Sequence, residues 1–70
     1  MNQIAAIMAG NVWKVIVSVG EKIEKGQDVV ILESMKMEIP IAAEANGIIK
    51  EIHVREGDFV NEGDILLEFE

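Results

Sequence analysis

The feature that most constrains the fold is an internal repeat with an offset of 37 residues. At this offset all six glycines pair: Gly10 with Gly47, Gly20 with Gly57 and Gly26 with Gly63. Apolar residues pair at the same offset, namely Val12 with Ile49, Val15 with Ile52, Val17 with Val54, Ile23 with Val60, Val30 with Leu67 and Leu32 with Phe69. Such self-similarity marks one supersecondary unit used more than once. Two copies are too few for a solenoid, so we expect two halves packed around a pseudo-twofold axis.

Each copy has the polarity pattern of β-strands. In "VWKVIVSV" and "IIKEIHVRE" apolar residues recur at period two, which is the period of a strand with one buried face. These are Val15 and Val17 in the first segment and Ile52 and Val54 in the second, whereas Lys14, Ser18, Glu51, His53 and Arg55 fall on the other parity. Paired glycines flank the equivalent apolar residues Ile23 and Val60 in "GEKIEKGQ" and "GDFVNEGD", a pattern typical of tight turns. Pro40 lacks an amide donor and should lie in an edge strand or at a strand start. No segment has a helical pattern, so the sequence predicts an all-β fold.

The inward positions of these strands predict a shared core. Its expected members recur across the repeat: Val15, Val17, Ile23, Val30, Leu32, Ile52, Val54, Val60, Leu67 and Phe69. Trp13 has the parity of Val15, so we expect a partly buried packing residue at this position rather than a platform for a cofactor.

Length and composition limit the function. Seventy residues make a single domain, 1–70, with little room for an enzyme cleft. The chain has no cysteine, which excludes disulfides and thiolate metal sites. A net charge of −7 would repel a nucleic-acid backbone. "MNQIAAIMAG" has no basic segment and is too short to span a bilayer. We therefore expect a soluble, cytoplasmic monomer that binds neither nucleic acid nor membrane.

One lysine stands outside the repeat. The first copy ends at Glu33, whose partner is Glu70, so Lys36 has no counterpart and lies in the connection between the halves. A short connection between the strand-like "VVILES" and "MEIPIA" is a hairpin, whose tip is exposed. Pseudo-symmetry puts the two termini at the opposite end. Lys36 lies between Met35 and Met37, flexible apolar residues of the kind used at adaptable binding surfaces.

These residues carry a resemblance to a known family. "ESMKMEIPI", with the preceding "GNVWKVIVSVGEKIEKGQDVVILE" and the following "NGIIKEIHVREGDFVNEGDILLEFE", resembles the biotinyl/lipoyl carrier domains over essentially the whole chain. The resemblance is strongest to biotin carboxyl carrier domains and to small stand-alone biotin/lipoyl attachment proteins. It implies a flattened barrel-sandwich of two four-stranded antiparallel sheets. The lack of a linker ahead of the domain indicates a free-standing module.

The resemblance also implies a function without catalysis by the chain itself. Biotin would be attached covalently to Lys36 by a biotin protein ligase and would shuttle carboxylate between the active sites of biotin carboxylase and carboxyltransferase subunits. A lysine amine can become a neutral nucleophile, whereas a guanidinium stays charged. Met35, Met37 and Glu33 are the expected recognition residues for the ligase, with Glu38 as a weaker addition.

Other polar residues have simpler interpretations. We expect the four remaining lysines to lie on the surface as solvated charges: Lys14, Lys22, Lys25 and Lys50. His53 falls on the solvent parity, with no cysteine or second histidine to share a metal, so no metal site is predicted. Glu33 and Glu38 could in principle act as an acid–base pair. No predicted pocket supports that role, so no catalytic residue is expected.

Two alternatives to a biotin carrier remain open. Lipoyl domains present a lysine at the same tip, but more often as Asp-Lys-Ala, so Met-Lys-Met favours biotin while leaving lipoate possible. From a different class, the chain could be an unmodified β-module that acts only in protein–protein contact.

Overall fold

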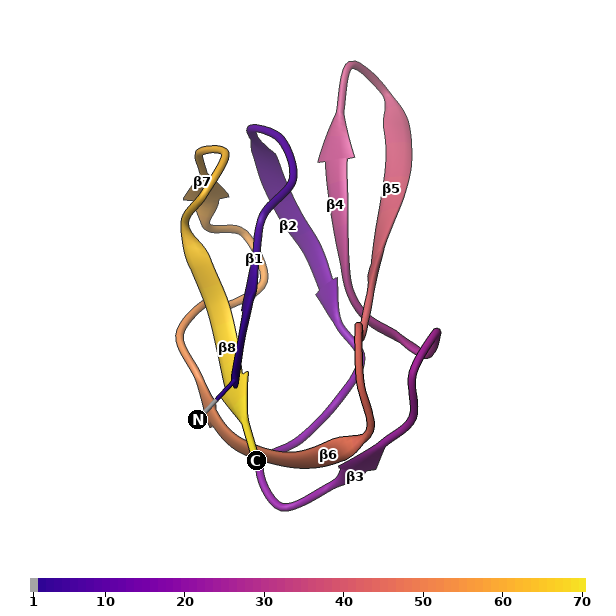
Figure 1. Cartoon of the computed structure of the whole chain (residues 1–70). Coiled ribbons are helices and arrows are strands. Elements are labelled where there is room, and N and C mark those ends of the chain that lie inside the picture. Colours follow the sequence, from indigo (N-terminus) through magenta and orange to yellow (C-terminus); the bar gives the residue numbers. More distant parts are fainter. Residues whose placement is uncertain (1) are drawn as a thin grey trace.

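The computed structural model describes residues 2–70, which form two four-stranded antiparallel sheets and contain no helix (Figure 1). The first four strands are β1 (Asn2–Ala5), β2 (Gly10–Val15), β3 (Lys22–Ile23) and β4 (Asp28–Ser34). The second four are β5 (Met37–Ala42), β6 (Gly47–Ile52), β7 (Phe59–Val60) and β8 (Ile65–Phe69). The predicted all-β architecture is confirmed. No helix long and apolar enough to cross a membrane occurs within these residues.

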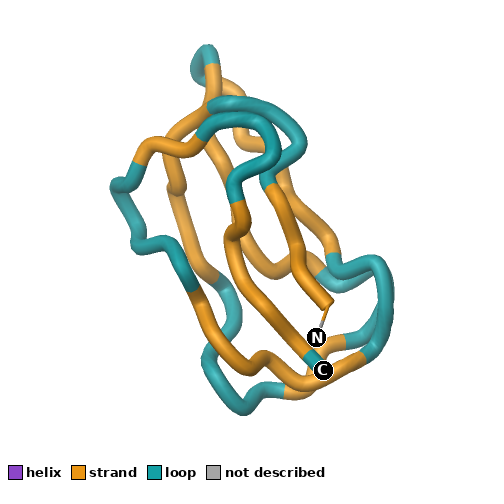
Figure 2. Tube along the Cα trace, turned by 60° about the vertical axis from the view of Figure 1, so that its left-hand side comes forward, coloured by secondary structure: helices purple, strands orange, loops and turns teal. Residues whose placement is uncertain are grey.

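The strand order shows how the repeat builds the fold. One sheet has the order β1-β8-β6-β3 and the other β5-β4-β2-β7. A shift of 37 residues converts β2, β3 and β4 into β6, β7 and β8, and it superimposes β1 on β5. The same shift therefore converts one sheet into the other, as the two-layered trace suggests (Figure 2). The expected pseudo-twofold arrangement is confirmed.

The turns repeat as closely as the strands do. Gly20 and Gly57 have φ of 89° and 97°, a left-handed conformation that favours glycine. The Gly20 amide donates to the Ile49 carbonyl, and the Gly57 amide donates to the Val12 carbonyl, both at 2.8 Å. These equivalent bonds tie each turn to a strand of the other half of the chain.

The core forms between the two sheets. Eight of the ten predicted core residues are buried, and Val15 and Ile52 are partly buried and pack against them. Among residues 2–70, the buried hydrophobic residues that the pattern did not predict are Ile4, Ala6, Val12, Val29, Ile41, Ala43, Ile49 and Leu66. Several of these break the strict alternation, because the strands contain bulges.

Trp13 lies in one of these bulges, and its predicted partial burial is wrong. Between β2 and β4 the pairing shifts from Val12 with Leu32 to Lys14 with Ile31, so Trp13 has no partner. An extra residue of this kind reverses the inward parity. Trp13 is 41% exposed, and its ring lies 5.2 Å from Lys14 Nζ. The equivalent shift between β6 and β8 occurs at Lys50.

The ends of the molecule are distinct. The β4–β5 hairpin rises at one end, while both termini lie at the other (Figure 1). Pro40 lies in β5, an edge strand of its sheet, as predicted. The molecule measures 31 × 19 × 18 Å, so the hairpin projects along its long axis (Figure 1).

Candidate functional site

The β4–β5 hairpin places Lys36 in a two-residue turn. Ser34 pairs with Met37, which leaves only Met35 and Lys36 between the strands. Their φ values are 53° and 64°. Positive φ at both central residues is the pattern of a type I′ turn, whose twist matches that of the flanking strands. Such turns usually contain Asn-Gly, because a left-handed conformation costs a residue with a side chain roughly 1–2 kcal/mol.

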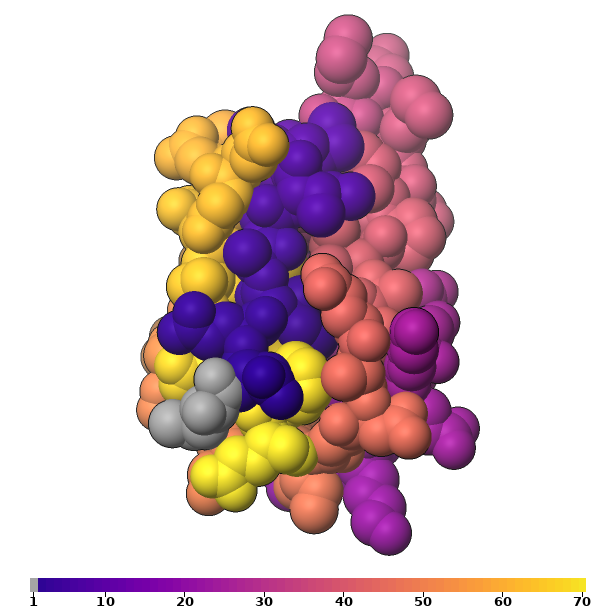
Figure 3. All heavy atoms as spheres, viewed as in Figure 1, coloured from indigo at the N-terminus to yellow at the C-terminus, as the bar shows by residue number. Residues whose placement is uncertain are grey.

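This unusual turn displays the side chains of its two central residues and of Met37, the first residue of β5. Met35 is 91% exposed and Met37 is 65% exposed, and Lys36 is also exposed. Within residues 2–70, Lys36 forms no ion pair. The space-filling view shows the hairpin standing above its surroundings (Figure 3). The amine of Lys36 is therefore accessible to another protein from several sides. Backbone strain kept at an exposed tip is typical of a functional segment.

Two carboxylates flank the turn on its outer face. Glu33 and Glu38 are direct cross-strand partners, and both are exposed. Neither carboxylate has an ion-pair partner in the described part of the chain. Like charges directly opposite each other in a sheet are destabilising. The hairpin thus brings all five residues of interest together: Glu33, Met35, Lys36, Met37 and Glu38.

The other four lysines lie on the surface, as predicted. Lys14, Lys22, Lys25 and Lys50 are all exposed. Lys50 pairs with Glu70 at 3.7 Å, and Lys14 lies over the Trp13 ring. None of them lies in a hairpin tip comparable to that of Lys36.

His53 has neighbours that the sequence did not reveal. It is exposed, as predicted, but its Nε2 lies 3.4 Å from Glu51 Oε2 and 3.7 Å from Glu68 Oε2. The antiparallel pairing of Glu51 with Glu68 creates this cluster, so strand register is the signal that would have found it. A protonated imidazole can pair with both carboxylates here. The cluster lies in the other sheet, away from the hairpin.

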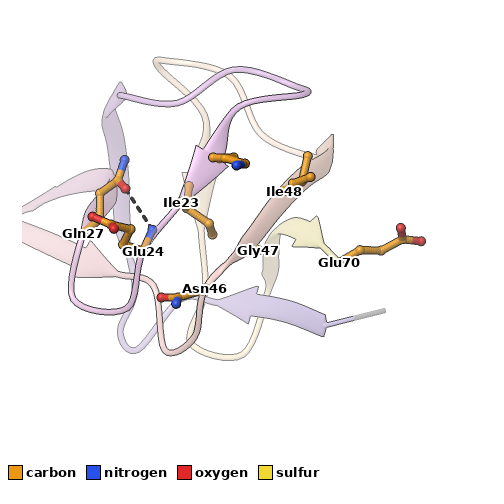
Figure 4. A pocket seen from close by; sticks show the side chains of 8 residues that line it. Ile23, Glu24, Gln27, Asn46, Gly47, Ile48 and Glu70 are labelled. Atoms are coloured by element: carbon orange, nitrogen blue, oxygen red, sulfur yellow. Dashed lines mark hydrogen bonds between the residues drawn. The ribbon is translucent and has the colours of Figure 1, made fainter.

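A hollow on the surface also lies away from Lys36. It has a volume of about 570 Å³ and is lined by residues such as Ile23, Asn46 and Glu70 (Figure 4). The Gln27 side chain accepts a hydrogen bond from the Glu24 amide at its edge. The lining residues belong to the end of the molecule where the chain terminates. The accessible lysine tip, rather than this hollow, is the candidate functional site.

Comparison with known proteins decides the family. Residues 1–69 match the Biotin_lipoyl family, described as "Biotin-requiring enzyme". The chain belongs to this family. Over 61 residues it is also 70% identical to the biotin/lipoyl attachment protein of Bacillus subtilis, which covers 87% of the chain and 84% of that protein. The predicted family is therefore confirmed.

Other members of the biotin/lipoyl family are parts of larger proteins. The chain is 45% identical to a segment of Bacillus subtilis pyruvate carboxylase that covers 99% of the chain and 6% of the enzyme. A solved structure of a single-chain, multi-domain long-chain acyl-CoA carboxylase matches with a TM-score of 0.92 and 34% identity. That match covers 97% of the chain and 7% of the carboxylase.

The comparisons also bear on catalysis. The chain is 44% identical to the biotin carboxyl carrier protein of Streptococcus mutans over 66 residues, which cover 94% of the chain and 51% of that protein. Two relatives of which the match covers more than four fifths, in Bacillus subtilis and Solanum lycopersicum, are named as an attachment protein and a biotin carboxyl carrier protein. The prediction of a non-catalytic carrier component is thereby confirmed.

Proposed function

We propose that the chain is a biotin carrier in which Lys36 is acylated by a biotin protein ligase. The observation that carries the proposal is the position of Lys36 in an exposed two-residue turn, with no ion pair inside residues 2–70. A covalent group on this side chain would extend into solvent, away from the rest of its own domain. The site therefore fits a group that must reach other proteins.

Attachment requires little from the chain except an available amine. The ligase activates the biotin carboxyl group with ATP. Lys36 Nζ then attacks the acyl carbon, the nucleotide leaves with the bonding electrons, and the amine loses a proton as the amide forms. The charge of the lysine is removed in the product. Met35 and Met37 supply adaptable apolar contacts to the ligase. Glu33 and Glu38 supply negative charge to the same contact.

Attached biotin supplies the capacity to carry a carboxylate. The chain contributes a rigid β-scaffold and a projecting arm, so the group can visit the biotin carboxylase and carboxyltransferase subunits in turn. Tethering of this kind gives effective concentrations on the order of millimolar without tight complexes. The partners expected are thus the ligase and these two carboxylase subunits.

A lipoyl carrier is the second candidate. It is favoured by the name of the Bacillus subtilis relative, a biotin/lipoyl attachment protein, and by the description of the family as Biotin_lipoyl. The same amine would form the same type of amide with lipoate. An unmodified interaction module is the third candidate, in which the exposed methionines alone would contact a partner.

Mass spectrometry separates these candidates. The purified chain is incubated with a biotin protein ligase, ATP and biotin, and in parallel with a lipoate ligase, ATP and lipoate. We expect a single biotin adduct that peptide mapping places on Lys36. If only a lipoyl adduct forms, the proposed cofactor would be lipoate rather than biotin. No adduct in either reaction, together with an unmodified intact mass from the native host, would support the interaction module.

A further inference from the structure

A row of exposed side chains crosses one sheet just below the lysine hairpin. Phe59 pairs with Asn11, Asn11 pairs with Glu33, and Glu33 pairs with Glu38. Directly paired residues project from the same face of a sheet. All four are exposed, whereas the following or preceding residues Val60, Val12 and Leu32 are buried. The four residues therefore lie on the outer face, and we call them the tip row.

The tip row lies close to the acceptor lysine. Neighbouring strands are about 4.8 Å apart, so the row spans roughly 14 Å from Phe59 to Glu38. Its four strands, β7, β2, β4 and β5, stand in this order across the sheet (Figure 1). Lys36 lies three residues beyond Glu33. A protein that holds Lys36 in its active site can cover the whole row with an interface of standard size.

Phe59 gives the tip row an apolar anchor. Its side chain is 62% exposed, although it belongs to a strand whose other residue, Val60, is buried. Aromatic side chains, including Phe, are enriched in protein interfaces relative to the rest of the surface. The equivalent residue in the other half is Lys22, so the repeat does not require an aromatic residue here.

The carboxylates of the tip row also differ from their symmetry equivalent. Glu70 is the repeat partner of Glu33 and pairs with Lys50 at 3.7 Å. Glu33 and its neighbour Glu38 have no such cation among residues 2–70. Their negative charge is available to a partner, and its complement is a basic surface.

From these observations we infer that the tip row is the docking surface for the ligase that acylates Lys36. The partner surface that fits it has lysine or arginine side chains opposite Glu33 and Glu38 and an apolar pocket for Phe59. This inference rests on the proposed function, because it concerns acylation of the same lysine. It extends the recognition site from the hairpin to β2 and β7, which are distant in the sequence.

Steady-state kinetics of biotin transfer test the docking surface. Phe59→Ala is compared with Val19→Ala, since Val19 is 63% exposed but its neighbour Gly20 bonds to Ile49 at the opposite end of the molecule. Loss of a docking contact raises KM and leaves kcat nearly unchanged. We expect Phe59→Ala to raise KM for the carrier about tenfold, as for a typical interface anchor. Val19→Ala should behave as the unsubstituted protein.

The charge of the row is tested separately. Glu33→Gln combined with Glu38→Gln should lower kcat/KM and flatten its dependence on NaCl, because opposite charges speed association at low salt. Glu24→Gln, which removes an exposed carboxylate elsewhere, is the matched control. Circular dichroism of each variant verifies that the β-fold is retained.

The outcomes separate the two proposals. Absence of labelling in the unsubstituted chain would overturn biotinylation itself. Normal labelling of the unsubstituted chain, with Phe59→Ala and Val19→Ala indistinguishable in KM, would overturn the docking surface alone. An equal rise in KM in both alanine variants would also overturn the docking surface, because the effect would then not depend on the tip row.

Discussion

Glu33 and Glu38 lie directly opposite each other on the two strands that carry the lysine turn. Two exposed carboxylates in this position repel each other, and neither has an ion-pair partner within residues 2–70. The hairpin is therefore less stable than its β-branched and aliphatic strand residues would allow. A binding partner with basic side chains would relieve the repulsion.

Replacing one of these carboxylates with a cation should stabilise the fold. Glu38→Lys converts a like-charge pair into an opposite-charge pair, for which we expect a gain of about 0.5 kcal/mol in the free energy of unfolding at low salt. Urea titration measures the change. Glu24→Lys serves as control, and raising the NaCl concentration should reduce the gain. A gain of the same size in the control would show that net charge, rather than the pair, is responsible.

The backbone of the turn offers a second prediction. Met35→Asn combined with Lys36→Gly installs the residues that a type I′ turn favours. Because both positions have positive φ, we expect the free energy of unfolding to rise by about 1–2 kcal/mol. Urea titration beside the unsubstituted chain measures it. A loss of stability would mean that the methionine and lysine side chains make stabilising contacts that outweigh the strain.

Substitution of the lysine alone separates reactivity from stability. Lys36→Arg should abolish biotin transfer, since a guanidinium does not lose its proton at physiological pH. Its stability should change by no more than roughly 0.5 kcal/mol, because the residue is exposed. Streptavidin blotting and thermal melting give the two readouts. Continued labelling, for example at Lys14 or Lys50, would identify a different acceptor.

Two glycines should respond differently to alanine. A Cβ at Gly47 would lie 2.5 Å from the Glu70 carbonyl oxygen and 2.5 Å from Phe69 Cδ2, so Gly47→Ala should destabilise by about 2 kcal/mol. Gly57→Ala meets no atom within 4 Å, but its φ of 97° should cost about 1 kcal/mol. Thermal unfolding of both variants gives the comparison. A neutral Gly47→Ala would show that β6 and the C-terminal residues can separate without loss.

The repeat and the alternation of polarity were sufficient to predict much of the fold. They identified residues such as Val17 and Val54 as core and placed Lys36 in a hairpin at one end. It was harder to predict which residues in the middle of each strand face the core. The bulges at Trp13 and Lys50 reverse the inward parity, and bulges depend on pairing with a neighbouring strand rather than on local sequence.

Some residues of the candidate site could likewise be predicted from local sequence, and others could not. Met35, Lys36 and Met37 are contiguous, so local sequence was enough to bring them together. Phe59 and Asn11 join Glu33 only through the pairing of β7 with β2 and of β2 with β4. His53 likewise approaches Glu68 only through the β6–β8 pairing. Residues so distant along the chain could not be grouped without knowing the strand order.

The strand order also determines how the chain can be divided. Four of the six strand pairings among residues 2–70 join the first half to the second: β1 with β8, β2 with β7, β3 with β6, and β4 with β5. Neither half has a complete sheet of its own, so we expect each to be unfolded as an isolated peptide. Two separate halves mixed together could reassemble as a noncovalent complex. Because the halves are equivalent in topology, this domain has the geometry of a twofold dimer whose subunits are joined into one chain by the lysine-bearing hairpin.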